Sequence, residues 1–182
     1  MTDAPVRLAP AAVDAALLQN ARPGKRAFYA VPLKQQILHV QYWKDMLAAA
    51  GFKENDIPGN WKDYWSFWCD RVQPAYRTAT DTQVHGIGNP MGVQSADSAR
   101  SFLSWIDAYN VKLVDDSGKL LVDSPEVRSG LIAALTDYVD LYLKGCTPGT
   151  STAWKDPDND AAFENRMTVM THDYDFAIVA RW

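Results

Sequence analysis

The chain has 182 residues, 47% of them hydrophobic, and a net charge of −4, which is typical of one folded domain or two small ones and excludes wholesale disorder. The acidic balance, without a cluster of Lys and Arg, argues against nucleic-acid binding, and two cysteines exclude a disulfide-rich scaffold and a structural zinc site. Aromatic residues are frequent (7 Trp, 8 Tyr and 6 Phe), and they are the first indication of function.

The first fifty residues predict two helices and two strands. A helix is expected over residues 10–20, and the sequence Arg22-Pro23-Gly24 ends it. Residues 27–31 read as a short extended run, and alternation of side chains predicts a strand over 37–42. Residues 44–50 form a compact helix that Gly51 ends, because glycine adopts the left-handed conformation at a helix C-terminus.

The Trp-rich segment that follows is predicted to be a helix with Asn60 as its N-cap. Trp61, Tyr64, Trp65 and Trp68 recur at helical spacing, so a packed core is favoured over a sugar-stacking platform. Pro74 is expected to end this helix.

The middle of the chain alternates loops and helices. The glycine-rich stretch 86–92 is expected to be a loop, after which Ser95 or Asp97 caps a helix. The runs 112–114 and 120–122 flank Asp115-Asp116-Ser117-Gly118 and predict a small hairpin.

The last third begins with the clearest helix start of the sequence. Ser124 is the expected N-cap, Pro125 occupies the first turn, and the helix runs to Gly145. A short helix over 158–165 and a strand over 167–172 follow, with a further strand over 177–182.

Trp154, Asp158 and Asn159 are the first candidates for ligand contact. Trp154 stands in the polar segment 150–156, where an aromatic side chain serves either ligand stacking or local packing. Asp158 and Asn159 offer a carboxylate and an amide for a pair of hydroxyl groups, but capping of the following helix is favoured as the role of at least one acidic or amide group of this segment. The spacing does not match a calcium-binding loop.

Other chemistries lack their motifs. His39, His85 and His172 are far apart in sequence, so neither a metal nor a cofactor is expected. No serine stands in a G-x-S-x-G elbow, and the glycines at 86 and 88 lack the spacing of a nucleotide-binding loop. Residues 1–30 do not read as a signal peptide, and no apolar run is long enough for a membrane span.

Several segments, taken in order, resemble the family 1 extracellular solute-binding proteins, the sugar receptors of bacterial ABC importers. The strand and helix over 37–52 are similar to that family's "ilyYNkdlfkkAGf", and Ile57-Pro58-Gly59-Asn60-Trp61 stands where the family has "iPkTW". Further similar segments are 29–33, 86–92, 116–126, 145–163 and 167–171. The resemblance covers about residues 27–172.

The resemblance implies a helix-rich α/β fold, the type II periplasmic-binding-protein-like lobe, with a few crossover strands and a small hairpin. Family members are two-lobed and about twice as long, so the chain is expected to be a truncated receptor. Residues 1–26 would then be a helix and linker from the missing first lobe, and 27–182 the mostly helical second lobe.

The resemblance also implies the function, which is to bind a carbohydrate or polyol for the membrane subunits of an ABC importer, without catalysis. It places Trp154, Asp158 and Asn159 at the ligand cleft, with Tyr42 and Asp97 as further candidates. The compartment would be the periplasm or the cell surface. There Cys69 and Cys146 would either pair or remain free buried thiols.

Two other functions remain open at the level of sequence. Paired carboxylates among 22 acidic residues are compatible with a small carbohydrate-active hydrolase. Alternatively, the Trp-rich helix packs on a protein partner, which would make the chain a helical interaction module.

Overall fold

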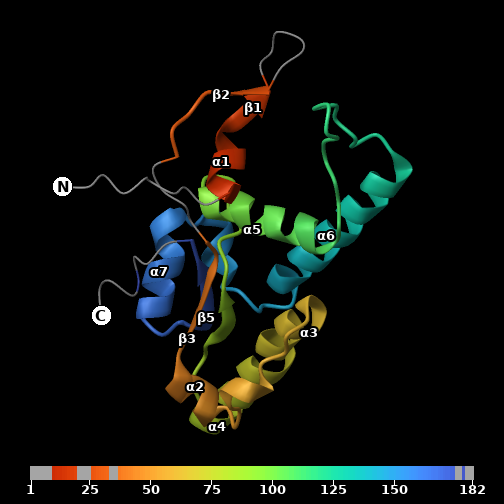
Figure 1. Cartoon of the computed structure of the whole chain (residues 1–182). Coiled ribbons are helices and arrows are strands. Elements are labelled where there is room, and N and C mark those ends of the chain that lie inside the picture. The colour runs from red at the N-terminus through yellow and green to blue at the C-terminus, as the bar shows by residue number, and fades with distance from the viewer. Residues whose placement is uncertain (1–9, 20–25, 33–36, 175–177, 179–182) are drawn as a thin grey trace, which may run out of the picture. The chain divides into compact units, whose positions relative to one another are not determined.

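The computed structural model describes residues 10–19, 26–32, 37–174 and 178 (Figure 1). Contacts divide the chain into two compact units, Met1–Ile37 and Leu38–Trp182. The boundary predicted between residues 26 and 27 falls inside the first unit.

The first unit holds one helix and a two-stranded sheet. Helix α1 (Pro10–Ala16) leads into strand β1 (Leu17–Gln19), which pairs antiparallel with β2 (Arg26–Phe28). The helix predicted over 10–20 is therefore too long, because residues 17–19 make strand hydrogen bonds with a segment further along the chain instead of continuing the helix.

The second unit is built on a three-stranded sheet in the order β3-β5-β4, with β3 (His39–Tyr42), β5 (Thr168–Asp173) and β4 (His85–Gly88). The central strand β5 runs antiparallel to β3 and parallel to β4. The strands predicted over 37–42 and 167–172 are confirmed within two residues at either end. The strand predicted over 177–182 falls outside the described residues, apart from Ile178.

The prediction of a loop over 86–92 is wrong at its start, because residues 86–88 belong to strand β4. The side chains of Gly86-Ile87-Gly88 give no alternating pattern, since two of the three residues are glycine. The glycines are needed for packing: a Cβ atom on Gly86 would collide with the backbone of Trp68, and one on Gly88 would lie 2.8 Å from Oγ1 of Thr168.

Helices surround the sheet. The segment between β3 and β4 contains α2 (Lys44–Ala49), the 3-10 turn η1 (Glu54–Asp56), α3 (Trp61–Ser66), the π-helical segment η2 (Phe67–Val72) and α4 (Gln73–Thr80). Gly51 has φ +84°, and the Asn60 side chain accepts a hydrogen bond from the Asp63 amide, so both predicted helix ends are confirmed. Pro74 does not end the helix, since the chain is helical on both sides of it, in η2 and in α4.

The segment between β4 and β5 contains α5 (Ala96–Ala108), α6 (Pro125–Leu143), the 3-10 turn η3 (Gly149–Ala153) and α7 (Asp156–Glu164). Ser95 and Ser124 cap α5 and α6 through hydrogen bonds from the amides of Ser98 and Val127. The hairpin predicted over 112–122 is reduced to a single antiparallel bridge between Val114 and Leu120.

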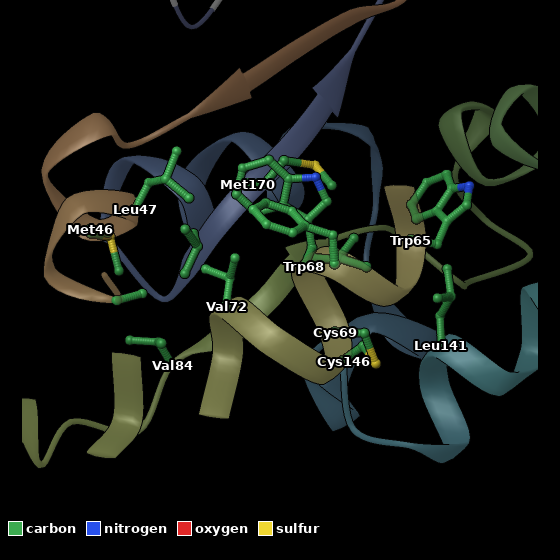
Figure 2. Close-up of a cluster of buried hydrophobic side chains, with 14 of the residues drawn as sticks. Met46, Leu47, Trp65, Trp68, Cys69, Val72, Val84, Leu141, Cys146 and Met170 are labelled. Carbon is green, nitrogen blue, oxygen red and sulfur yellow. A yellow bond between two sulfur atoms is a disulfide. The ribbon is translucent and has the colours of Figure 1, made fainter. Parts of the chain in front are cut away.

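The core lies between the sheet and η2, whereas α7 packs on β5 and β4. Figure 2 shows Trp68 of η2 beside Met170 of β5, with Val72 and Leu47 close by. Trp65 is 3% exposed and Trp68 is fully buried, so the prediction that the Trp-rich helix packs in the core is confirmed for these two residues.

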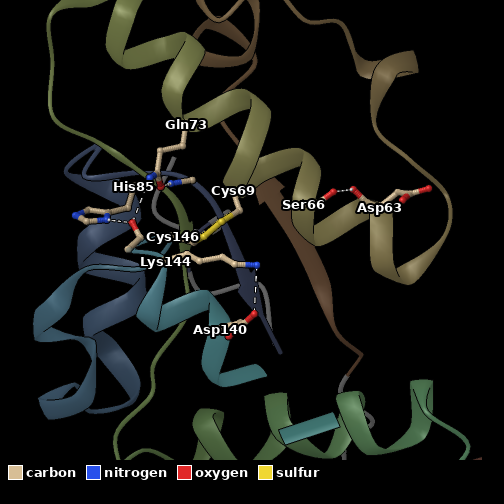
Figure 3. Close-up of a disulfide and its surroundings, with 10 residues drawn as sticks. Asp63, Ser66, Cys69, Gln73, His85, Asp140, Lys144 and Cys146 are labelled. Atoms are coloured by element: carbon tan, nitrogen blue, oxygen red, sulfur yellow. Dashed lines mark hydrogen bonds and ion pairs between the residues drawn. A yellow bond between two sulfur atoms is a disulfide. The ribbon is translucent and has the colours of Figure 1, made fainter. Parts of the chain in front are cut away.

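A disulfide joins Cys69 of η2 to Cys146, just after α6 (Figure 3). The two Cα atoms lie 5.0 Å apart, although 77 residues separate them in sequence. The pairing left open by the sequence is therefore present in the structure.

Candidate functional site

The carboxyl ends of β4 and β5 lie at one edge of the sheet, because these two strands are parallel. Strand β3 begins at the same edge, with His39 opposite Asp173. In open α/β sheets, ligands bind outside the carboxyl ends of the strands, where the following loops diverge. This edge, called the carboxyl edge below, is therefore the first place to look for a site.

Two loops meet at the carboxyl edge. The loop after β4 and the turn η3 approach each other closely, since the Met91 amide donates to the Ser151 carbonyl oxygen at 3.0 Å. A Cβ atom on Gly92 would lie 2.7 Å from the Thr152 carbonyl oxygen and 2.9 Å from that of Trp154. Only glycine allows this approach, which fixes the loop that leads into α5.

Acidic side chains gather where these loops lead into α5 and α7. Asp156 begins α7, and its Oδ1 accepts hydrogen bonds from the Ser95 hydroxyl at 2.7 Å and from the Asp97 amide at 3.2 Å. Asp97 pairs with Arg100 at 2.9 Å, and the Arg100 guanidinium lies 5.7 Å from the centre of the Tyr174 ring. Asp173 accepts a hydrogen bond from the Gln41 amide group at 3.3 Å.

Electrostatics couple these carboxylates. Burial raises the pKa of Asp97 above its ordinary value, and the negative charges of Asp156 and Asp173 raise it further, while Arg100 opposes the shift. The hydrogen bond from Ser95 lowers the pKa of Asp156. The group therefore offers carboxylate oxygens as acceptors, together with one guanidinium as a donor.

An aromatic hollow of about 230 Å³ lies on the α3 side of the sheet. Trp61 and Tyr64 supply its rings, Asn60 and His172 its polar side chains. Leu38, Val40, Pro58 and Gly59 complete the lining. Val40 and His172, which pair near the carboxyl edge, line the hollow, whereas Asp97, Asp156 and Asp173 are not among its lining residues.

His172 forms the inner wall of the hollow. Its Nε2 atom lies 3.0 Å from the Tyr64 hydroxyl, and its ring packs edge-on against Trp65 at 4.9 Å. Burial lowers the pKa of His172 to about 4, so the ring is neutral at physiological pH.

The predicted site residues fall into separate places. Asp97 belongs to the cluster of carboxylates that it forms with Asp156 and Asp173. Trp154 ends η3 and is only 8% exposed, with its indole N–H donated to the Thr150 hydroxyl at 3.1 Å. Asp158 accepts a hydrogen bond from the Lys155 amide at 2.7 Å, which confirms the helix-capping role weighed for this segment.

Asn159 is buried behind the carboxyl edge, and Tyr42 lies at the opposite end of β3. Asn159 is fully buried and donates from its amide nitrogen to the His172 carbonyl oxygen at 3.2 Å. No part of the side chain is accessible in this structure, and direct contact with a ligand hydroxyl stays a prediction. Tyr42 pairs with Met170, three residues before Asp173 along β5, and its hydroxyl donates to Glu54.

Sequence reasoning did not select the residues that line the hollow. Of the three clustered carboxylates it selected Asp97, but neither Asp156 nor Asp173. Trp61 and Tyr64 belong to the helix assigned to the core, and they stand in its first turn, where the helix reaches the sheet edge. His172 is the last residue of a predicted strand and Asp173 follows it, and the end of a strand is the signal that would have indicated them.

Metal chemistry and membrane insertion find no support in the described part of the chain. No three or more His, Cys, Asp or Glu side chains there are grouped to hold a metal ion. Within the same residues, every helix falls short of the length and apolarity that crossing a bilayer requires.

Comparisons with known proteins agree with this architecture. A family described as bacterial extracellular solute-binding protein matches residues 2–182. The structure is similar to MalE3 of T. maritima, solved with maltose bound, with a TM-score of 0.61 and 24% identity over 91% of this chain and 37% of that one.

A second similar structure is the GacH receptor of Streptomyces glaucescens, described both unliganded and in complex with acarbose. Its TM-score is 0.55, with 20% identity over 91% of this chain and 36% of that one. The chain thus spans about a third of the length of either structure. Both matches confirm a helix-rich α/β fold that is part of a larger one. No curated protein matches the sequence.

Proposed function

The chain belongs to the bacterial extracellular solute-binding proteins, and we propose that it supplies the part of such a receptor that holds a carbohydrate or polyol for an ABC importer. The observation that carries this proposal is that a cluster of carboxylates and an aromatic hollow both lie at the carboxyl edge. A sugar presents hydroxyl groups around its ring and C–H groups on its faces, and these two features need acceptors and aromatic surfaces respectively.

Asp97 is the residue that we assign to a ligand hydroxyl, with Asp173 beside it. The Asp97 side chain is 13% exposed and is held in place by Arg100, so its carboxylate is oriented before a ligand arrives. An oriented acceptor loses little conformational entropy on binding, which favours affinity. In this arrangement Arg100 is a second contact for hydroxyl oxygens.

Trp61 and Tyr64 are the residues that we assign to ring stacking, because they line an open hollow. Trp154 is the sequence-based candidate for the same role, but its burial and its bond to Thr150 favour a supporting role at the base of the loop. We assign Asn159 and Asp158 to positioning as well, since their polar groups hold the end of β5 and the start of α7. Tyr42 stays a weaker candidate.

The remaining parts of the proposal concern the setting. The importer's membrane subunits are the proposed partner, and the periplasm or cell surface is the proposed compartment. The Cys69–Cys146 disulfide supports an oxidising compartment. We propose a binding role without catalysis, in keeping with a family of binding proteins.

The test is calorimetric titration of the chain with maltose, glucose and a polyol such as sorbitol. We expect saturable binding in the millimolar range, because one face of a cleft supplies only part of the contacts of a closed receptor. Asp97→Asn should weaken binding about tenfold, as expected for the loss of a charged hydrogen-bond acceptor. Asp116→Asn removes a charge from an exposed turn and is the matched control.

Two results would count against the proposal. One is the absence of saturable binding for every saccharide and polyol. The other is steady release of the chromophore from a chromogenic glycoside, abolished by Asp97→Asn or a like variant, because it would favour a hydrolase that uses paired carboxylates.

A further inference from the structure

A buried amide side chain follows strand β4 at the carboxyl edge. It belongs to Asn89, which is 2% exposed. Its Oδ1 atom accepts a hydrogen bond from the Ser101 hydroxyl of α5 at 3.0 Å, and its Nδ2 atom donates to the Met91 sulfur at 3.2 Å. The Asn89 side chain is therefore directed to partners inside the protein, and its strongest link is to helix α5.

The backbone of Asn89 is tied to a different part of the chain, the segment that follows α6. The Thr147 hydroxyl accepts a hydrogen bond from the Asn89 amide at 3.4 Å and donates one to the Asn89 carbonyl oxygen at 3.0 Å. Two residues earlier, the Ile87 amide donates to the Cys146 carbonyl oxygen at 3.0 Å. The segment after α6 is thus fastened along the end of β4 before it continues into η3 and α7.

Helix α6 contributes a third link to the same place. The Tyr138 hydroxyl donates to the Pro90 carbonyl oxygen at 3.3 Å and lies 3.5 Å from the Ser98 carbonyl oxygen of α5. The side chains of this network are all more than nine-tenths buried: Asn89, Ser101, Thr147 and Tyr138. Because breaking a buried hydrogen bond leaves polar groups without water, such a network favours one arrangement of the elements that it joins.

The two elements joined by Asn89 lead to two of the clustered carboxylates. Asp97 stands in the first turn of α5, four residues before Ser101 and therefore on the same side of the helix. Asp156 begins α7, at the end of the segment that Thr147 fastens, and its Oδ1 atom accepts from the Asp97 amide. Fixing α5 and this segment to one residue fixes the place where the two carboxylates meet.

From these contacts we propose that Asn89 is a positioning residue of the sugar site, which holds Asp97 at the carboxyl edge by joining α5 to the end of β4. This inference rests on the function proposed above, in which Asp97 contacts a ligand hydroxyl. Burial is the main cause of the raised pKa of Asp97, so this pKa reports how closely α5 is held. When α5 is released, water reaches the carboxylate and the pKa falls toward its ordinary value.

The experiment removes the Asn89–Ser101 hydrogen bond from either side. In Asn89→Ala, NMR titration of the Asp97 carboxyl carbon should give a lower pKa than in the parent chain. Calorimetric titration with maltose should give about fivefold weaker binding, because the acceptor is no longer oriented before the ligand arrives. Ser101→Ala breaks the same bond and should change the pKa and the affinity in the same directions.

Gln73→Ala is the matched control, because Gln73 is also a buried amide that binds β4 (Figure 3). Its Oε1 atom accepts from the Gly86 amide at 2.6 Å, and its Nε2 atom donates to the Gly145 carbonyl oxygen at 3.2 Å. These bonds lie at the start of β4, away from the carboxyl edge. Gln73→Ala should lower the stability of the fold, as Asn89→Ala does, but should leave the pKa of Asp97 and the maltose affinity as in the parent.

An unchanged pKa of Asp97 in both Asn89→Ala and Ser101→Ala would overturn the inference. An equal fall in Gln73→Ala would do the same, because lost stability would then account for the effect. If Asn89→Ala does not fold, Ser101→Ala, which removes a single hydroxyl group, decides the question. The pKa is measured without ligand, so a parent chain that binds no saccharide contradicts the proposed function, whereas a parent that binds maltose, with an unchanged pKa in both variants, contradicts the role of Asn89.

Discussion

The Nε2 atom of His172 lies 3.0 Å from the hydroxyl oxygen of Tyr64, and this contact ties the end of β5 to α3. The His172 ring is buried against Tyr64 and Trp65, and burial lowers its pKa to about 4. In the unfolded chain a histidine has a pKa of about 6.5. The folded state therefore binds fewer protons than the unfolded state between these two pH values.

The first prediction concerns the stability of the fold in acid. Because the folded-state pKa of His172 is depressed, its contribution to stability is complete above about pH 6.5 and is lost as the pH falls toward 4. Between pH 7 and pH 4.5 this one group should lower the free energy of unfolding by about 2 kcal/mol. Urea denaturation at both pH values measures the loss.

The matched comparison uses His172→Asn. This variant should be less stable at pH 7, but its loss between pH 7 and 4.5 should be smaller than that of the parent by about 2 kcal/mol. The pKa of His85 is lowered by burial too, and that contribution stays in both proteins. Equal losses in parent and variant would show that His172 does not carry the effect.

A second prediction concerns Asn159, which donates to the His172 carbonyl oxygen from a fully buried position on α7. Asn159→Ala should lower the free energy of unfolding by about 2 kcal/mol, because it removes a buried hydrogen bond and leaves the carbonyl oxygen without its donor. Sugar affinity should fall as well, since the end of β5 loses its support. Thermal unfolding and calorimetric titration provide the two readouts.

Asn165→Ala is the control for this substitution. Asn165 follows the same helix and also donates to a backbone carbonyl oxygen, that of Ala161, but on the exposed surface. Its loss should cost less than about 1 kcal/mol, because water replaces the bond. A similar loss of stability in both variants would contradict the expectation that the buried hydrogen bond of Asn159 contributes more than the exposed one of Asn165.

The capping signals at Asn60 and Ser124 are local, and both were reliable. Asn60 and Ser124 cap their helices through amides three residues away, so the sequence around them contains the whole interaction. The π-helical segment η2 lies inside the predicted helix and was not distinguished from it, because the spacing of apolar residues does not reveal a local change of helix type. Strand β4 was missed because glycine provides no side-chain alternation.

The candidate site was harder to predict because it is assembled from distant segments. Asp97 and Asp156 are 59 residues apart in sequence. They are brought together in the fold, where the Asp156 carboxylate accepts hydrogen bonds from the Ser95 hydroxyl and the Asp97 amide. The residue types in segment 154–159 suggested ligand contact, but they did not reveal that folding buries Trp154 and Asn159. Burial depends on β5 and on the Gly92 loop, which sequence periodicity in this segment does not describe.

A third prediction concerns Gly92, the closest approach between the two loops of the carboxyl edge. In Gly92→Ala, the new Cβ atom would lie 2.7 Å from the Thr152 carbonyl oxygen, so one loop must shift. We expect a loss of about 1–3 kcal/mol in the free energy of unfolding and weaker sugar binding. Gly149→Ala is the control, since a Cβ atom there meets nothing within 4 Å and Gly149 does not line the aromatic hollow. Unchanged stability in Gly92→Ala would contradict the close packing.

A fourth prediction separates packing from ligand contact at Trp154. Because the indole is 8% exposed, Trp154→Ala should lower the free energy of unfolding by about 3 kcal/mol, the usual cost of removing a large buried side chain. Trp154→Phe keeps much of the packing and should keep sugar affinity. If Trp154→Phe is stable but binds sugar much more weakly, Trp154 contacts the ligand after all, and the supporting role proposed for it is wrong.

A fifth prediction concerns the disulfide, which closes a long loop between η2 and the end of α6 (Figure 3). Cross-linking residues 77 positions apart removes much of the conformational freedom of the unfolded chain, and on that account its loss should cost about 4 kcal/mol. Urea denaturation of the parent with and without a reducing agent measures this cost. The double variant Cys69→Ser/Cys146→Ser should match the reduced parent and should not respond to the reducing agent. Equal stability of oxidised and reduced parent protein would contradict the prediction, because a formed disulfide must then contribute nothing to the fold.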